Sequence, residues 1–313
     1  GPLGDMLSPL RRGFCVGMET GDTEFAGCNA AMCSIYGFQM GSPLPELQSE
    51  ENMFAESLAA LQKRTATPMH KSLAFFFEKF GLCEKQHGTS NSVPNNACDQ
   101  EQARGFGPVW SHFQGLFCAF LWGDYETAVY HADEHRAAWE FSDASVNVAL
   151  FLLMDGLARV ALYRHQKQQG THTRRPRLRL LRGNSRRLHH ICGLAPDYGL
   201  GKMFLLKAEL ASVTQKKSKK QAMNVIKAFK CAVSLSQTSQ ILFEHAMACE
   251  LAGRYLLQLD LDHHQEGISY LEEACRLYQQ WGGKAKEQHL KSDVSSIRSR
   301  MATNSVTANP VVA

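Results

Sequence analysis

The chain has 313 residues, of which 44% are hydrophobic, and its formal net charge at pH 7 is +4. This length is enough for a large core, the apolar share excludes a wholly disordered chain, and so small a positive charge does not by itself indicate a nucleic-acid-binding protein. The ten cysteines form no CxxC pair. This pattern is typical of reduced, buried cysteines such as Cys28, Cys118 and Cys275 in a cytoplasmic protein, rather than of a secreted disulfide framework.

The two ends of the chain are set apart from the predicted domain. Gly1-Pro2-Leu3-Gly4 is typical of the scar that a protease leaves when it removes an expression tag, so residues 1–5 are excluded. Residues 301–313 carry no apolar stripe, and we expect a flexible tail there. The predicted domain therefore spans residues 6–300, with a flexible loop insertion at 84–105, a stretch rich in Asn, Ser, Gln and Gly.

Apolar residues recur at helical spacing along the whole domain. In chain order the stripes are Phe25, Cys28, Met32 and Ile35; Phe54, Leu58 and Leu61; Val109, Phe113, Leu116 and Phe120; Ala222, Ile226, Phe229 and Val233; and Ile268, Leu271, Cys275 and Tyr278. Each set lies along one face of a helix. Since no segment alternates apolar and polar residues as a strand does, the sequence predicts an all-α fold of roughly eleven or twelve helices.

Two short stretches predict tight corners between helices. Gly21 and Asp22 open "GDTEFA", and Gly123 and Asp124 open "GDYETA". Glycine can adopt the left-handed conformation that ends a helix, and an aspartate after it can accept hydrogen bonds from the first N–H groups of the next helix. Each stretch therefore predicts that one helix ends and another begins with almost no loop between them.

The same two corners favour a repeat architecture. Small Ala26 and Ala128 let paired helices approach closely, and Tyr125 is placed to wedge between neighbouring pairs. Gly21 and Gly123 are 102 positions apart, three times the 34-residue period of tetratricopeptide repeats. The sequence therefore predicts a right-handed α-solenoid of antiparallel, tetratricopeptide-like helix pairs; the alternative is an irregular bundle with ordinary helix caps.

The stretch at 270–286, "YLEEACRLYQQWGGKAK", resembles the last repeat of the helical region found in large multidomain signalling kinases. Those proteins join a Ser/Thr kinase-like domain, an AAA-type ATPase, this helical region, a GAF sensor and often a histidine kinase. The resemblance rests on Tyr270, Leu271, Ala274, Tyr278, Trp281, Gly282 and Lys286. "LRRGFCVGMETGDTEFAG" and "GLAPDYGLGKMFLLKAELA" resemble the early hairpin and the Pro-containing turn of the same region.

What the resemblance implies is a non-catalytic interaction or scaffold module that couples the domains of a signal-transduction kinase. The partner is then a protein or peptide, or another domain of the same polypeptide, and not a membrane. The sequence itself has no phosphate-binding glycine loop, no GxSxG and no kinase catalytic motif. We therefore expect no catalytic residue, no cofactor and no metal in this segment.

The candidate interaction site is the arginine-rich stretch "RRPRLRLLRGNSRR". Its apolar positions and its arginines fall on two different helical stripes, namely Leu178, Leu181, Leu188 and Cys192, and Arg175, Arg179, Arg182 and Arg186. An arginine face can dock an acidic partner, a neighbouring domain or RNA, and an ordinary solvated helix face explains the same pattern. Nucleic acid is the less favoured partner, because no aromatic residues are interleaved with the arginines.

Two histidine clusters offer an alternative chemistry. The first comprises His131, Glu134 and His135, and the second comprises Asp262, His263, His264 and Glu266. Two histidines four residues apart can ligate a metal, but neither cluster supplies the further ligands or the HExxH pattern of a zinc site. The alternatives to a scaffold are therefore an all-α enzyme or metal-binding protein that uses these histidines, or an RNA-binding helical repeat that uses the arginines.

Overall fold

The fold is built from helices throughout the part of the chain that can be described. The structure is a computed structural model, and it describes residues 6–59, 73, 76–81, 106–138, 146–170, 178–214, 218–259 and 261–307. Twelve α-helices and a short 3-10 helix are bounded within these ranges, residues 76–79 are helical as well, and no described residue is in a strand, so the predicted all-α class is confirmed. Residues 1–5, the predicted loop at 84–105 and residues 308–313 lie outside the described ranges.

The helices follow one another with short connections wherever both ends are described. They are α1 (Leu7–Thr20), α2 (Thr23–Gln39), α3 (Leu44–Ala59), α5 (Phe106–Leu121), α6 (Tyr125–Ala138), α7 (Val146–Gln168), α8 (Leu178–Leu194), α9 (Pro196–Thr214), α10 (Lys219–Ser239), α11 (Leu242–Leu256), η2 (Leu261–His263), α12 (His264–Trp281) and α13 (Lys284–Thr307). The last helix continues beyond Arg300, so the predicted boundary at 300 falls inside α13. Within the described ranges, none of the helices has both the length and the apolar character needed to cross a bilayer.

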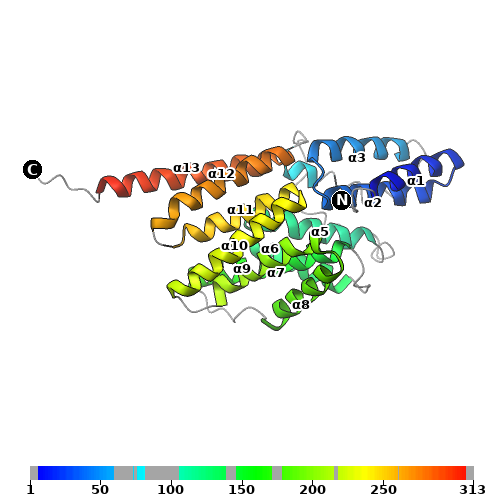
Figure 1. Ribbon diagram of the computed structural model, residues 1–313. Helices are drawn as coiled ribbons and strands as arrows, with labels where there is room; N and C mark the ends of the chain where they lie inside the picture. The colour runs from blue at the N-terminus through cyan, green and yellow to red at the C-terminus, as the bar shows by residue number, and fades with distance from the viewer. Residues whose placement is uncertain are drawn as a thin grey trace, which may run out of the picture.

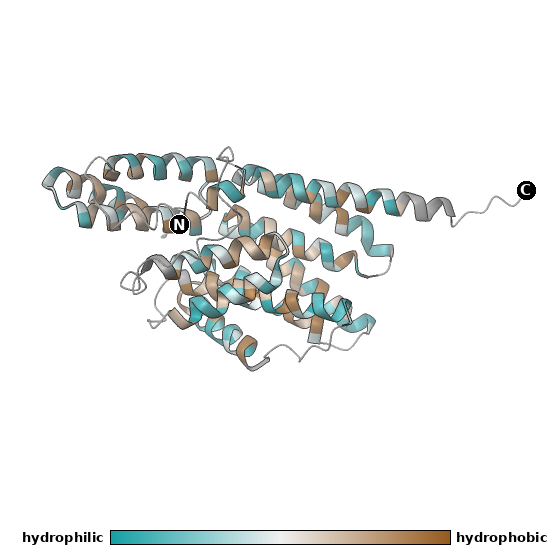
Figure 2. Ribbon diagram, turned by 180° about the vertical axis from the view of Figure 1, so that it is seen from behind, coloured by the Kyte–Doolittle hydropathy of each residue, from teal (hydrophilic) through white to brown (hydrophobic). Residues whose placement is uncertain are grey.

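Neighbouring helices pack in an ordered succession. From α5 onward each helix contacts the next, and α5 also contacts α7, α7 contacts α9, and α9 contacts α11. In Figure 1, α1–α3 extend from one end of the molecule and α13 from the other, with α5–α11 between and beside them. Hydrophobic residues gather where helices face one another, and hydrophilic residues line the outward faces (Figure 2).

Both glycine corners have the predicted conformation. Gly21 and Gly123 have φ angles of 79° and 81°, in the left-handed region that glycine adopts without a Cβ clash. Asp22 and Asp124 each accept, through Oδ1, a hydrogen bond from the backbone N–H three residues later, at 3.1 and 3.2 Å. These bonds satisfy N–H groups that have no partner within their own helix, so each corner both ends one helix and begins the next.

The residues around the second corner hold three helices together. The ring of Tyr125 lies 6.1 Å from that of Phe120 on α5 and 6.0 Å from that of His165 on α7. Ala128 is fully buried in the α5–α6 pair. Tyr125, at the start of α6, therefore lies between α5 and α7.

The buried face of α2 differs from the predicted one. Phe25 is 54% exposed and Cys28 is also exposed, so the stripe that begins with them is wrong, and only Ile35 at its end is fully buried. The face packed against α1 and α3 consists of small residues, Ala26, Ala30 and Cys33. A Cβ at Gly17 of α1 would lie 3.0 Å from the Cβ of Ala26, so the helices are close enough to exclude large side chains.

An aromatic cluster connects segments that are far apart in the sequence. Phe38 at the end of α2 lies 5.1 Å from the rings of Phe76 and Phe117 and stacks on Phe243 of α11 at 5.2 Å. Trp281, the last residue of α12, lies 6.3 Å from Phe38 and is fully buried. The early and late helices therefore share one core.

The end of α12 shows how closely these segments approach. Gly282 has a φ of 92°, and a Cβ there would collide with Pro45 at the start of α3. Two features therefore require glycine at this position, its left-handed conformation and the space that the ring of Pro45 occupies.

Candidate functional site

The basic stretch singled out in the sequence forms the amphipathic helix α8. Leu181, Leu188 and Cys192 are buried, while Arg182 and Arg186 are exposed. Of the other two candidate arginines, Arg175 lies outside the described residues, and Arg179 lies in α8 with a side chain that is also outside them. The apolar and basic faces are therefore opposed at the positions that can be checked.

Three more residues extend this face toward the end of α8. His189 and His190 are exposed one turn after Arg186, and Leu194 is 76% exposed. Residues at this spacing share one side of a helix. We name the exposed side chains Arg182, Arg186, His189 and His190 the α8 basic face. The two histidines were not singled out in the sequence, although their spacing from the arginines places them there.

A buried ion cluster holds α8 against its neighbours. Asp155 of α7 is fully buried and accepts hydrogen bonds from Arg136 of α6 at 2.5 Å and from Arg159 at 2.8 Å. Asn184 of α8 donates a third bond to the same carboxylate at 2.6 Å. Since a buried carboxylate is tolerated only when its oxygens are paired, this cluster fixes the orientation of α8 and of its basic face.

The two histidines of the first cluster are buried between α6 and its neighbours, whereas Glu134 is exposed. Nδ1 of His131 is 3.0 Å from Nδ1 of His112 on α5, a residue that the sequence analysis did not connect with it. His135 stacks on Phe151 with ring centroids 4.1 Å apart. Gly115 makes the necessary space, because a Cβ there would run into the ring of His131. The two helical histidines are thus packed between helices.

Burial dominates the titration of these histidines. Desolvation, with a further contribution from His112, lowers the pKa of His131 to about 4. Desolvation, His112 and Arg136 lower the pKa of His135 to about 3. Both rings are therefore neutral at physiological pH, which suits an uncharged packing role between helices.

The second predicted cluster is dispersed in the structure. Glu266 pairs with Lys230 of α10 at 2.6 Å, and Asp262 is exposed. His264 lies 3.2 Å from the backbone oxygen of Leu259 through its Nε2. Across the described residues, no three His, Cys, Asp or Glu side chains are close enough to hold a metal ion.

A second charged centre, which the sequence analysis missed, joins α11, α12 and α13. Glu250 of α11 accepts hydrogen bonds from Lys286 at 3.0 Å, Tyr278 at 3.0 Å and Arg254 at 3.0 Å. Lys286 also donates to the backbone oxygen of Leu121 at 2.7 Å, so the network reaches the end of α5. Tyr278 and Lys286 are two of the residues on which the family resemblance rests.

The charges of this network are strongly coupled. Burial acts to raise the pKa of Glu250, but Lys286 and Arg254 outweigh it and bring that pKa to about 2. Desolvation acts to lower the pKa of Arg254, but Glu250 and Asp293 outweigh it, so that pKa is raised above its ordinary value. Arg254 is therefore a permanent cation whose guanidinium is held by Glu250 at 2.9 Å and Asp293 at 2.8 Å.

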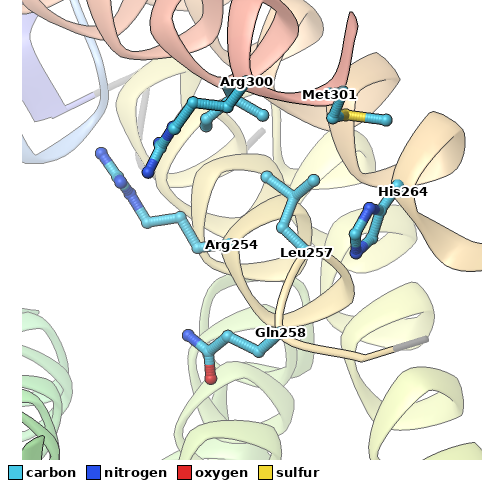
Figure 3. A pocket seen from close by; sticks show the side chains of 7 residues that line it. Arg254, Leu257, Gln258, His264, Arg300 and Met301 are labelled. Atoms are coloured by element: carbon cyan, nitrogen blue, oxygen red, sulfur yellow. The ribbon is translucent and has the colours of Figure 1, made fainter. Parts of the chain in front are cut away.

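Arg254 also forms one wall of a pocket between α11, α12 and α13. The cavity measures about 390 Å³ and is lined by Arg254, Leu257, Gln258, His264, Ile297, Arg300 and Met301. Figure 3 shows the side chains of Arg254 and Arg300 extending to the same side of the pocket, with His264 and Met301 on the other. We refer to this cavity as the α11–α13 pocket.

A buried lysine was also missed by the sequence analysis. Lys202 of α9 is fully buried, pairs with Glu244 of α11 at 2.8 Å, and donates to the backbone oxygen of Tyr198 at 2.8 Å. Desolvation lowers the pKa of Lys202 and raises that of Glu244, so burial works against both charges and their attraction offsets it. The pair links α9 to α11 and lines no pocket described above.

The residues with possible functional chemistry thus fall into two accessible groups, the α8 basic face and the α11–α13 pocket, while the helical histidines and Lys202 are buried. Comparison of the chain with protein-family models, curated proteins and solved structures found no match.

Proposed function

We propose that this chain is a non-catalytic interaction module that couples domains of a cytoplasmic signal-transduction protein. In this proposal the helices form a right-handed, tetratricopeptide-like solenoid, and the α8 basic face holds an acidic surface of a protein partner or of another domain of the same polypeptide. The module acts by fixing the relative positions of the parts that it binds.

The succession of helix contacts supports the solenoid. Contacts of α5 with α7, of α7 with α9 and of α9 with α11 come in addition to those between consecutive helices. Stacked hairpins give this pattern, because the first helix of each pair packs on its own partner and on the first helix of the next pair. The capped corner at Gly123 joins the helices of one such pair, α5 and α6.

The observation that carries the binding proposal is the α8 basic face itself. Arg182 and Arg186 are exposed above a buried apolar stripe, and α8 is held in place by the bond from Asn184 to Asp155. A guanidinium can form two parallel hydrogen bonds with a carboxylate, and it loses little freedom when its helix is already fixed. An acidic protein surface therefore suits this face.

The test replaces Arg175, Arg179, Arg182 and Arg186 with Gln and measures association with the parent protein's flanking domains by titration at low and moderate salt. We expect weaker binding and a flatter salt dependence, because charges at the edge of an interface chiefly set the association rate and its ionic-strength sensitivity. The helical content should stay unchanged, since Arg182 and Arg186 lie off the apolar stripe.

A matched control also removes four exposed cations, through Lys207→Gln on α9 and Lys219→Gln, Lys220→Gln and Lys227→Gln on α10. If partner binding weakens as much in the lysine control as in the arginine variant, the effect comes from net charge alone, and the proposal that the α8 basic face binds the partner specifically is contradicted. Binding that is unchanged in the arginine variant also contradicts it. Steeply salt-dependent binding of RNA through the same arginines would support the nucleic-acid alternative instead.

A further inference from the structure

We propose that the α11–α13 pocket binds an exposed peptide segment in which an acidic side chain stands next to an apolar one. This inference rests on the proposed interaction function and adds a second binding surface to it, with a defined partner chemistry. The argument depends on the charges around the pocket, on its apolar wall and on its open form.

The charges around the pocket suit one carboxylate. Two cations, Arg254 and Arg300, line the pocket; two carboxylates, Glu250 and Asp293, already pair with Arg254, and the buried Lys286 pairs with Glu250. One positive charge is left uncompensated in this group, which matches a carboxylate and not a phosphate dianion. Arg300 is exposed, and its bond to the backbone oxygen of Ser296 is long, at 3.4 Å, so its guanidinium is free to turn toward a ligand.

The pocket also has an apolar wall. Leu257, Ile297 and Met301 line it, and each is partly buried against the main core. An apolar side chain seated there would leave water, and this burial favours binding. A ligand that satisfies both walls must therefore carry its carboxylate close to an apolar group.

The open form of the pocket favours a peptide over a small molecule. The cavity of about 390 Å³ is open to solvent. Small ligands bind firmly when a pocket buries most of their surface, which an open cavity does not do. A segment of a larger partner gains further contacts outside the cavity, so partial enclosure is sufficient for it.

Arg254 is already positioned for this role. Its bonds to Glu250 and Asp293 hold the guanidinium in one place, and Gln258, in the turn after α11, belongs to the same lining. A receptor group that is fixed before binding loses little entropy when the ligand arrives. Arg254 is therefore the fixed cation of the pocket and Arg300 is the adjustable one.

The test uses three synthetic peptides with acetylated and amidated ends, of the form AAELAA, AAQLAA and AAEALA. The first has Glu next to Leu, the second lacks the charge, and the third separates the two side chains. NMR titration of the full chain should give a dissociation constant on the order of 1 mM for AAELAA. We expect at least tenfold weaker binding of AAQLAA and several-fold weaker binding of AAEALA.

Two variants of α13 locate the site. Arg300→Gln removes the adjustable cation and should weaken AAELAA binding about tenfold, whereas Arg298→Gln removes an exposed cation that pairs with Glu272 and does not line the pocket. We expect Arg298→Gln to leave the dissociation constant within twofold. Equal losses in both variants, or equal binding of AAELAA and AAQLAA, would overturn the proposal.

Two further measurements distinguish a peptide from other ligands of the pocket, and the pocket proposal from the α8 proposal. Inorganic phosphate that displaces AAELAA at equal concentration, or 4-methylpentanoate that binds as tightly as the peptide, overturns the peptide assignment. The α8 arginine variant should bind AAELAA normally. If the wild-type protein does not bind AAELAA but its partner association still depends on the α8 arginines, only the pocket proposal is refuted. If it binds AAELAA as expected but its partner association does not depend on the α8 arginines, only the α8 proposal is refuted.

Discussion

Single residues decide where helices end in this protein, and the corner at Gly123 gives a direct measure of that effect. Gly123 has a left-handed φ of 81°, whereas Gly183 lies in α8, is not among the glycines with positive φ, and has no atom within 4 Å of an added Cβ. Gly123→Ala should therefore destabilise the protein by about 1–2 kcal/mol, while Gly183→Ala should stabilise it by about 0.5–1 kcal/mol. Urea unfolding of the two variants measures both free energies.

The neighbouring cap extends this prediction. Asp124→Ala removes the carboxylate that accepts the N–H of Thr127 and should cost about 1 kcal/mol. If the two glycine variants change the free energy of unfolding in the same direction, or if Asp124→Ala leaves it unchanged, the corner does not depend on these residues.

At the scale of elements, the α5–α6 pair should respond to mild acid. His131 and His135 have pKa values of about 4 and 3 in the folded protein, below the ordinary value of 6.5. The unfolded chain therefore binds more protons as the pH falls below 6.5, and the free energy of unfolding decreases, through His131 down to about pH 4 and through His135 down to about pH 3. Each histidine contributes a slope of at most about 1.4 kcal/mol per pH unit.

The variant His131→Gln tests this dependence. At pH 8 both histidines are neutral, so the difference from the wild type there gives the packing cost of the substitution alone. Between pH 6.5 and 4 the free energy of unfolding should fall less steeply in the variant than in the wild type. Parallel curves over this range would rule out His131 as a source of the acid sensitivity.

The sequence predicted elements well where large side chains form the buried stripe. In α12 the residues Ile268, Leu271, Cys275 and Tyr278 are all buried, as their spacing indicates. In α2 the same reasoning fails, because the helix packs through Ala26, Ala30 and Cys33. A periodicity of bulky residues misses a face that is buried through close approach of small ones.

The candidate functional residues also divide into those that helical spacing predicts and those that it does not. The exposed Arg182 and Arg186 of α8 follow from helical spacing, which is local information. Arg254 and Arg300 share a pocket although they belong to α11 and α13, and Lys202 meets Glu244 across two helices. Nothing in local spacing brings such pairs together, because only the packing of whole helices does so.

For the whole molecule, Phe38 should couple the early and the late helices. It is buried and contacts the rings of Phe76, Phe117 and Phe243. Phe38→Ala should destabilise the protein by about 3–5 kcal/mol. Hydrogen exchange followed by mass spectrometry should show faster exchange in α2 and also in α11 and α12.

Phe14→Ala is the matched control, because Phe14 packs on Phe54 in the separate small cluster of α1–α3. Its effect on hydrogen exchange should stay within those three helices. If exchange in α11 and α12 does not change in Phe38→Ala, the aromatic cluster does not couple the two ends.

The contact between Phe38 and Trp281 has a consequence for synthesis of the chain on the ribosome. More than two hundred residues separate Phe38 from Phe243 and Trp281, the rings that complete its surroundings. Helices form soon after they leave the ribosome, but this core can close only once α12 has emerged. Until then Phe38, Phe76 and Phe117 present an incomplete apolar surface, so nascent chains that stop before residue 281 should bind chaperones, and release of α12 should end that binding.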